Sequence, residues 1–259
     1  MKIEVLGAFG SKLKNLGMTS ILINDKVSID AGNIVRKGEK IFQLEHIVLT
    51  HQHLDHIADI PYLIAESFPV RKNPLKIYTH TKALESISRH ILNTEIWPDF
   101  SSIKMIDRED SSLRYEKISL GQEINIDGLK ITPFESNHTV LTFGYKVYDQ
   151  KSNCAFLITG DTWKQDNVWE IANSDPDVKA IFVDVSYPKR MRELGKISKH
   201  LSSDVFEEEL YKLKRKDLKI YVYHIKPAFR KEVIDEISEI KKRTKFKIEI
   251  LKDGMTFEI

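Results

Sequence analysis

The sequence contains a single cysteine, and this scarcity limits how the chain can be stabilised and where it can reside. With Cys154 alone no internal disulfide can form, which is typical of proteins in a reducing compartment. No stretch reaches the ~18 consecutive apolar residues that a membrane-spanning helix requires. The opening MKIEVLGAFG also lacks the apolar segment of a signal peptide. These absences predict a cytoplasmic, soluble protein with no membrane partner.

A large excess of charge of one sign is absent as well. The chain has 40 Lys and Arg residues against 38 Asp and Glu residues, which leaves a formal net charge of +2. The bulk composition therefore does not indicate nucleic acid as a partner. Hydrophobic residues make up 41% of the sequence and charged residues 30%, as in ordinary globular proteins. Because no low-complexity linker interrupts the 259 residues, we expect a single domain over residues 1–259.

Short apolar runs alternate with amphipathic stretches along the chain. The runs predict strands at residues 3–9, 20–24, 27–32, 46–50, 129–134, 155–161, 180–186 and 219–225. The amphipathic stretches predict helices at residues 56–68, 81–92, 202–215 and 231–243. Residues 246–259 have the pattern of a β-hairpin with Asp253-Gly254 at its turn. Strands and helices in both halves favour an α/β fold of two packed sheets with helices outside.

Four side chains that can bind a metal lie within six positions, directly after the predicted strand at 46–50. They are His51, His53, Asp55 and His56. In an extended segment residues two apart project in the same direction, so His51 and His53 can converge on one point. Imidazole nitrogens with a carboxylate suit zinc, and also manganese or iron. Four ligands exceed what one catalytic metal with an open position requires, so we expect a second metal with ligands from elsewhere.

Three later residues meet that need, and each lies at the end of an apolar strand. They are His138, Asp161 and His224. Strand ends open onto loops at one rim of a sheet, where active sites are commonly assembled. Taken alone, His138 could be an ordinary polar residue and Asp161 could cap a turn. The shared placement at strand ends favours a common role in metal binding.

These motifs resemble the metallo-β-lactamase fold superfamily. Its His-x-His-x-Asp-His motif matches residues 51–56 position for position, and the likeness extends from VLGAFG near the start to HIKP at 224–227. The resemblance implies a four-layer αββα sandwich with two divalent metal ions, with zinc expected ahead of manganese or iron. It also implies how the seven ligands divide. One metal would be held by His51, His53 and His138, the other by Asp55, His56 and His224, with Asp161 bridging them.

Three further segments narrow the resemblance. Leu54, the stretch NTEIWPDF at 93–100 and the HIKP segment are similar to class II cyclic-nucleotide phosphodiesterases. His200 lies where phosphodiesterases of the superfamily place a histidine near the scissile phosphate. The resemblance implies hydrolysis of a small phosphodiester, above all a 3′,5′-cyclic nucleotide to its 5′-monophosphate. The attacking group would be a hydroxide held between the metals.

In that reaction Asp55 and His200 are the predicted catalytic residues. His200 would donate a proton to the leaving 3′-oxygen or hydrogen-bond the phosphate, so it is also a predicted substrate-binding residue. Trp97 and Phe100 are predicted to bind substrate by stacking on the base, with packing in the core as the alternative. The expected partners are a small phosphodiester substrate and, because it is common in this superfamily, a second copy of the chain.

Other functions remain open at this point. An RNA 3′-end-processing nuclease would resemble this chain around His200, but such enzymes typically have glycine where Leu54 stands, and they carry an RNA-binding arm. No long Gly- or Lys-rich insert could serve as that arm. A carboxylic ester, thioester or lactone hydrolase could use the same hydroxide on a carbonyl carbon. A silent binding protein should have lost ligands, and a redox di-iron protein would need a flavin-bearing partner or domain.

Overall fold

The computed structural model describes residues 1–259 and contains two seven-stranded mixed sheets. The first sheet has the strand order β14 (Thr256–Glu258), β1 (Lys2–Gly7), β2 (Ser20–Ile23), β3 (Val27–Ile29), β4 (His46–Val48), β5 (Leu75–Thr79) and β6 (Leu113–Lys117). The second has the order β13 (Lys247–Ile250), β12 (Lys219–Tyr223), β11 (Val178–Asp184), β10 (Cys154–Ile158), β9 (Thr142–Asp149), β8 (Leu129–Ser136) and β7 (Ile124–Ile126).

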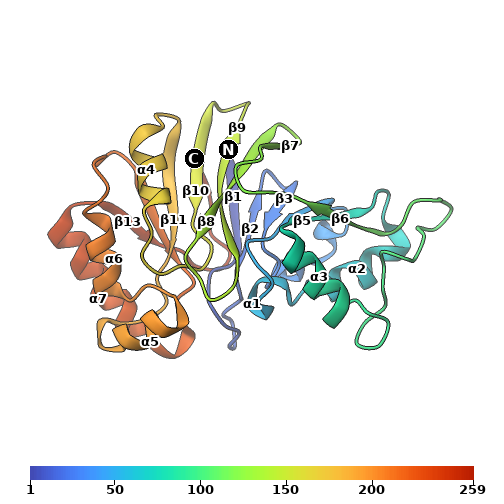
Figure 1. The fold of residues 1–259 in the computed structure, drawn as a ribbon, viewed down its shortest axis with the longest axis horizontal. Helices are drawn as coiled ribbons and strands as arrows, with labels where there is room; N and C mark the ends of the chain where they lie inside the picture. Colours follow the sequence, from blue (N-terminus) through green and yellow to red (C-terminus); the bar gives the residue numbers. More distant parts are fainter.

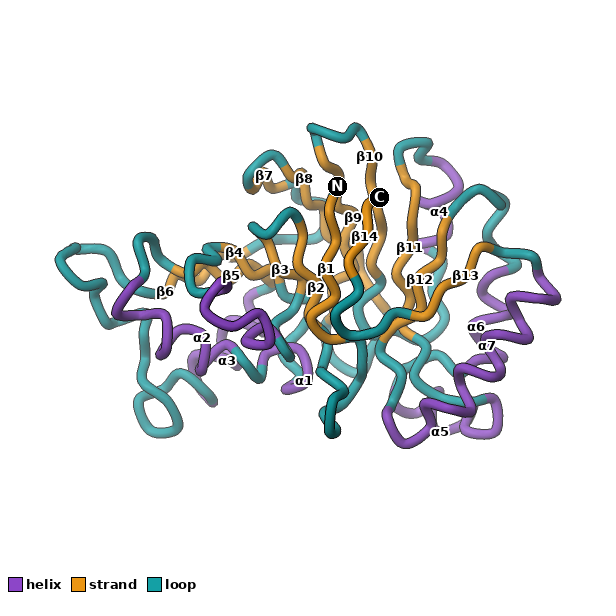
Figure 2. Tube along the Cα trace, turned by 180° about the vertical axis from the view of Figure 1, so that it is seen from behind, coloured by secondary structure: helices purple, strands orange, loops and turns teal.

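Seven α-helices cover the outer sides of the two sheets (Figures 1 and 2). The helices beside the first sheet are α1 (Leu54–Ile57), α2 (Ile60–Ser67) and α3 (Thr81–His90). The helices beside the second sheet are α4 (Asn167–Ser174), α5 (Arg192–Ser198), α6 (Ser203–Leu210) and α7 (Arg230–Thr244). The predicted four-layer αββα sandwich is therefore confirmed. None of these helices combines the length and the apolar character needed to cross a membrane.

The alternation of side chains along the strands produces two hydrophobic cores. In β4, Val48 points into the larger core that the two sheets share, whereas Ile47 points into a smaller core beneath α2. In β2, Ile23 and Leu22 divide in the same way. Because successive side chains point to opposite faces of a strand, a strand buried on both faces reads as a continuous apolar run. This explains why the sequence shows short apolar runs rather than polar–apolar alternation.

The ends of several strands lie at one edge of the sandwich, and this edge carries the polar residues of interest. In the first sheet β3 and β4 are parallel, and in the second β10, β11 and β12 are parallel. The carboxyl ends of parallel strands meet at the same edge, where the chain leaves the sheet in loops. The sequence thus places the residues that follow these strands next to one another in space.

The predicted hairpin over residues 246–259 is wrong. The turn at Asp253-Gly254 forms, but β13 pairs with β12 of the second sheet and β14 pairs with β1 of the first. The Asp253 carboxylate accepts hydrogen bonds from the backbone N–H groups of Ala8 and Gly17, at 2.9 and 2.6 Å. The last two strands therefore connect the two sheets, and their connection holds the loop between β1 and β2.

The predicted helix over residues 56–68 is divided into α1 and α2. The break at Ala58-Asp59 has a local cause, because the neighbouring loop competes for the backbone groups. Ala31 N–H donates to the His56 carbonyl at 2.7 Å, and Asp59 N–H donates to the Ala31 carbonyl at 3.0 Å. These bonds replace helical ones and fix His56 against the loop that follows β3. Pro61 lies in the first turn of α2, where proline is tolerated.

Candidate metal centre

The structure brings all seven predicted ligands together at the carboxyl edge of the sandwich. His51 and His53 follow β4, and Asp55 and His56 lie in α1. The other three follow strands of the second sheet: His138 follows β8, Asp161 follows β10 and His224 follows β12. The centre is thus built from both sheets, and residues more than 160 positions apart in the sequence meet there.

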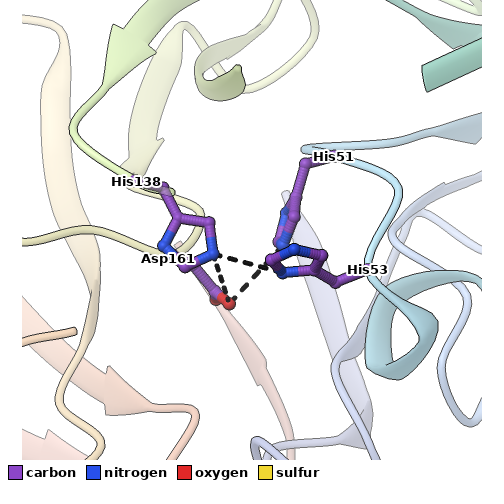
Figure 3. Close-up of side chains that lie close together, drawn as sticks. All are labelled: His51, His53, His138 and Asp161. Atoms are coloured by element: carbon purple, nitrogen blue, oxygen red, sulfur yellow. Dashed lines mark hydrogen bonds and ion pairs between the residues drawn. The ribbon is translucent and has the colours of Figure 1, made fainter. Parts of the chain in front are cut away.

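Four of these residues form a first group, shown in Figure 3. The ligand atoms of His51, His53, His138 and Asp161 all lie within 4.8 Å of one another. His138 Nε2 lies 3.2 Å from His53 Nδ1, and His51 Nε2 lies 3.6 Å from Asp161 Oδ2. The side chains of His51 and Asp161 are at most 1% exposed. Three imidazoles and one carboxylate therefore converge on a single small space.

A second group consists of Asp55, His56 and His224. His56 Nε2 lies 3.3 Å from His224 Nε2, and His224 Nε2 lies 3.3 Å from Asp55 Oδ2. Asp161 reaches this group too, because its Oδ2 lies 3.3 Å from His56 Nε2 and its Oδ1 lies 3.3 Å from His224 Nε2. Asp161 thus stands between the two groups, in the position that a bridging ligand would occupy. The division of the seven residues matches the one that the family resemblance implies.

Hydrogen bonds behind the histidines fix which ring nitrogens face the centre. His56 Nδ1 lies 2.7 Å from Asp30 Oδ2, and His138 Nδ1 lies 3.1 Å from the Lys199 carbonyl oxygen. His224 Nδ1 lies 3.4 Å from an oxygen of Asp184. These acceptors hold the proton on Nδ1, so the Nε2 lone pairs point inward. Lone pairs facing each other across 3.3 Å repel unless a cation lies near them.

Two buried atoms of the centre have no hydrogen-bond partner in the protein. They are His51 Nε2 and Asp161 Oδ1. Buried polar atoms are nearly always paired, and an unpaired one carries a desolvation cost. Both atoms are metal ligands by chemical type, and both face the converging lone pairs. The residues therefore fit divalent metal ions, although the ligand set accepts more than one metal.

The surroundings shift the pKa values of the histidines in opposite directions. Burial lowers the pKa of His138 to about 4 and holds the pKa of His51 well below its ordinary value. Both imidazoles are therefore neutral near neutral pH, the form that binds a metal. Burial acts on His56 in the same direction, but the carboxylates of Asp161, Asp30 and Asp55 raise its pKa above the ordinary value. That opposite shift reports a local excess of negative charge.

Backbone conformations of the left-handed region accompany the centre at three non-glycine residues. The φ angles are 58° at Asp30, 66° at His224 and 58° at Lys199. Asp30 hydrogen-bonds His56, His224 belongs to the second group, and the Lys199 carbonyl accepts from His138. Such conformations cost free energy and persist where the surroundings enforce them, commonly at functional sites. Here Asp30 and Lys199 place acceptors behind histidines of the centre, and His224 is a candidate ligand itself.

His200 lies beside both groups, paired with a residue that the sequence analysis missed. Its Nδ1 is 2.8 Å from Asp184 Oδ2 and 3.9 Å from Asp161 Oδ2. Asp184 also lies near His224 and accepts from Ser186 Oγ at 2.8 Å. Together Asp161, Asp184, His200 and His224 form a third group with metal-ligand spacing. His200 is thus placed either to transfer protons or to bind a metal.

Asp30 and Asp184 were both detectable in the sequence by position. Asp30 follows the apolar residues of β3, and Asp184 ends β11. They share this strand-end placement with Asp161, which the sequence analysis named on that ground. Their role differs from that of Asp161 because of where they lie. Asp30 and Asp184 contact the Nδ1 atoms of His56 and His224, on the side of the rings that faces away from the centre. Spacing in the sequence cannot separate a ligand from the residue behind it.

The two predicted base-stacking residues lie elsewhere. Phe100 is 6% exposed and packs against Phe68, with ring centroids 5.7 Å apart. Trp97 packs edge-on against Tyr62 at 5.3 Å and borders the same core beneath α2. Neither belongs to a group around the histidines. The core-packing alternative therefore describes both side chains, and buried Phe100 has no open face for a base.

A comparison with known protein families shows to which family this chain belongs. Residues 22–249 match the model of the family described as beta-lactamase superfamily domain. The chain belongs to that family. The match runs from β2 to β13 and so includes every residue of the metal centre.

Individual proteins are similar to this chain at low sequence identity. Ribonuclease Z of Methanopyrus kandleri is 27% identical over 131 residues, which is 49% of this chain and 41% of that protein. The match thus spans less than half the length of this relative. The crystal structure of unliganded yeast PDE1 has a TM-score of 0.81 at 19% identity, with 100% of this chain and 99% of that chain covered. Human tRNase Z, short form, has a TM-score of 0.72 at 15% identity, with 100% and 99% covered. At these identities the two structures show a shared fold.

Asp30 provides a first test of the centre. Asp30→Asn keeps the shape of the side chain but weakens the acceptor that holds the His56 proton on Nδ1. We expect the affinity for zinc to fall about 10- to 100-fold. The measurement is competition for zinc with a chromophoric chelator. Asp25→Asn, on the exposed turn between β2 and β3, is the matched control and should bind zinc like the unaltered protein. Equal zinc affinity of the Asp30 and Asp25 variants would contradict the assignment.

Proposed function

We propose that this protein is a dinuclear, metal-dependent phosphodiesterase that hydrolyses a small phosphodiester, with a 3′,5′-cyclic nucleotide as its substrate. The observation that carries the proposal is the position of Asp161, whose carboxylate lies 3.6 Å from His51 Nε2 of the first group and 3.3 Å from His56 Nε2 and His224 Nε2 of the second. A centre of this kind suits reactions in which charge develops on both an attacking and a leaving oxygen. Phosphodiester hydrolysis is such a reaction.

The residues of the candidate metal centre have distinct roles in the proposed reaction. His51, His53 and His138 would hold one ion, Asp55, His56 and His224 the other, with Asp161 between them. Two bound divalent ions, zinc ahead of manganese or iron, would lower the pKa of water and offset charge on phosphate oxygens. The Asp55 side chain is 21% exposed, so one of its oxygens can also contact the attacking water.

His200 would supply the proton for the leaving oxygen. Its Nδ1 is tied to the Asp184 carboxylate, so the ring is held in one orientation. The remaining nitrogen, Nε2, is the one that can give a proton to the ribose oxygen as its bond to phosphorus breaks. His200 is only 6% exposed, which keeps bulk water from competing for that proton. This arrangement supports a proton donor better than a surface histidine would.

A second candidate is an RNA 3′-end-processing nuclease. The observation in its favour is the likeness to ribonuclease Z of Methanopyrus kandleri. The chemistry would be the same, because RNA is also a phosphodiester. We favour the small substrate because the longest connection of the first sheet, residues 91–112, folds back and packs Phe100 into the core. Phe100 thus holds the middle of that connection against the body of the protein, which argues against its use as an extended RNA-binding arm.

Substrate trials with metal analysis test the proposal. The purified protein, with zinc or manganese quantified, would be given cyclic AMP, bis(p-nitrophenyl) phosphate, a precursor tRNA and a lactone. We expect cyclic AMP to be converted to 5′-AMP and the tRNA to stay intact. Cleavage of the tRNA with no turnover of cyclic AMP would favour the nuclease. A protein that holds two metals per chain and cleaves no phosphodiester would exclude both candidates.

Two further expectations from the sequence stay predictions. These are the cytoplasmic location and the association of two copies. Light scattering on the purified protein measures the second directly, and a monomer at micromolar concentration would contradict it.

A further inference from the structure

Lys226 is the one Lys or Arg side chain that lies within 4.0 Å of a carboxylate in the metal centre. Its Nζ is 3.5 Å from Asp55 Oδ2. Every other ion pair of Asp30, Asp55, Asp161 and Asp184 is made with a histidine. If Asp55 binds a divalent ion, the ammonium lies beside a cation, and this is electrostatically unfavourable unless a further anion joins it there. Lys226 therefore needs a reason for its position.

The position of Lys226 is enforced by its surroundings. Its Nζ donates to the Gly10 carbonyl at 2.6 Å, and its backbone N–H donates to the Ser186 carbonyl at 3.1 Å. The backbone at Gly10 approaches His224 so closely that a Cβ there would lie 2.6 Å from the imidazole Cε1. The Lys226 side chain is still 22% exposed. The ammonium group is thus fixed at the border between the centre and solvent.

Before a metal-held water loses its proton, the charges of the centre would leave one positive charge uncompensated. Four carboxylates, those of Asp30, Asp55, Asp161 and Asp184, would balance two divalent ions when the histidines are neutral. Lys226 then adds one positive charge, and a phosphodiester carries one negative charge. Charge-assisted hydrogen bonds from an ammonium to a phosphate oxygen are among the stronger polar contacts. The Lys226 ammonium thus offers a positive charge to an anionic substrate at the border of the centre, and a neutral ester has no charge to pair with it.

The geometry points to Lys226 as a substrate-binding residue that contacts an anionic phosphate oxygen and makes the centre select phosphodiesters over neutral esters. This inference deepens the proposed function and rests on it. With Asp55 engaged by a metal, the ammonium is free to turn its remaining donors to the substrate. A role confined to orienting Asp55 would instead appear as weaker metal binding.

Three lysine variants separate these roles. Lys226→Met removes the charge and keeps a flexible chain of similar length, Lys226→Arg keeps the charge, and Lys231→Met changes the same net charge on the exposed start of α7. For each, the metal content, the kcat and KM for bis(p-nitrophenyl) phosphate, and the Kd for 5′-AMP would be measured in the metal-loaded protein. Turnover of neutral p-nitrophenyl acetate gives a comparison without substrate charge.

We expect Lys226→Met to keep two metals per chain and to raise both the KM for the diester and the Kd for 5′-AMP by about 10- to 100-fold. Any turnover of the neutral ester should be unaffected, Lys226→Arg should recover most of the affinity, and Lys231→Met should behave like the unaltered protein. Unchanged 5′-AMP affinity in Lys226→Met, or loss of metal, would overturn the inference. If the unaltered protein binds 5′-AMP but cleaves no phosphodiester, the proposed function fails, and the 5′-AMP affinities alone decide the role of Lys226.

Discussion

Asp161→Asn is expected to lower phosphodiester hydrolysis by more than about 10³-fold and to leave the protein with less than two metals per chain. The asparagine keeps the volume of the side chain but removes the charge and one of the two oxygens that face the ligand groups. Oδ2 lies 3.6 Å from His51 Nε2 of the first group and 3.3 Å from His56 Nε2 of the second. Oδ1 lies 3.3 Å from His224 Nε2 of the second, so the substitution affects both groups at once. The loss should exceed that of any single histidine on the rim.

Elemental analysis and bis(p-nitrophenyl) phosphate turnover measure this outcome together. Asp166→Asn is the matched control, because Asp166 stands five positions further along and its side chain is 72% exposed. That variant should keep its metals and its rate. An Asp161→Asn protein that retains two tightly bound metals would show that Asp161 is not shared between them. The thermal midpoint of each apo-protein should be recorded, so that unfolding is not mistaken for loss of metal.

His200→Ala is expected to keep both metals and to lose about 10²- to 10⁴-fold in kcat. The reason is that His200 touches the centre from the side of the second sheet, with its Nδ1 bonded to Asp184 at 2.8 Å and only 3.9 Å from Asp161. If its role is proton donation, the loss falls on the chemical step. KM should then change little, and the loss should be smaller for substrates with a p-nitrophenolate leaving group, which needs no proton.

The comparison of cyclic AMP with bis(p-nitrophenyl) phosphate supplies the sharpest readout for His200. A ribose oxygen is a poor leaving group, so its departure depends on the proton donor far more than that of nitrophenolate does. His90→Ala, an exposed position at the end of α3, is the control. Loss of a metal in His200→Ala would assign His200 to the third ligand group, with Asp184 and His224, and would contradict its role as an acid.

The ligands themselves could be predicted because each one occupies a position that the fold makes special. His51 and His53 follow a buried strand with the spacing of an extended chain, and Asp161 follows another. The end of a strand can be recognised in the sequence as the point where an apolar run stops. Parallel strands then bring these ends to one edge whatever the separation along the chain. The convergence of these residues on one candidate metal centre could therefore be predicted from the sequence.

The pairing partners of the last two strands and the burial of Phe100 could not be predicted in the same way. The alternation in β13 and β14 is that of a hairpin, and nothing local tells the chain that Leu251 N–H bonds Val222 in one sheet while Gly254 N–H bonds Val5 in the other. Phe100 likewise reads as an aromatic residue in a polar segment, and only the tertiary structure buries it against Phe68. Such choices depend on long-range packing, which outweighs local pattern.

The pairing of β1 with β14 has a consequence for how the protein is made. Lys2 lies opposite Glu258, and the Asp253 carboxylate holds the loop that presses Gly10 against His224. During synthesis β1 therefore leaves the ribosome long before β14, the strand that covers one of its edges. Contacts between such distant segments make folding slow. Until residues 253–258 emerge, the nascent chain exposes an unpaired strand, and help from a chaperone would be most valuable in that interval.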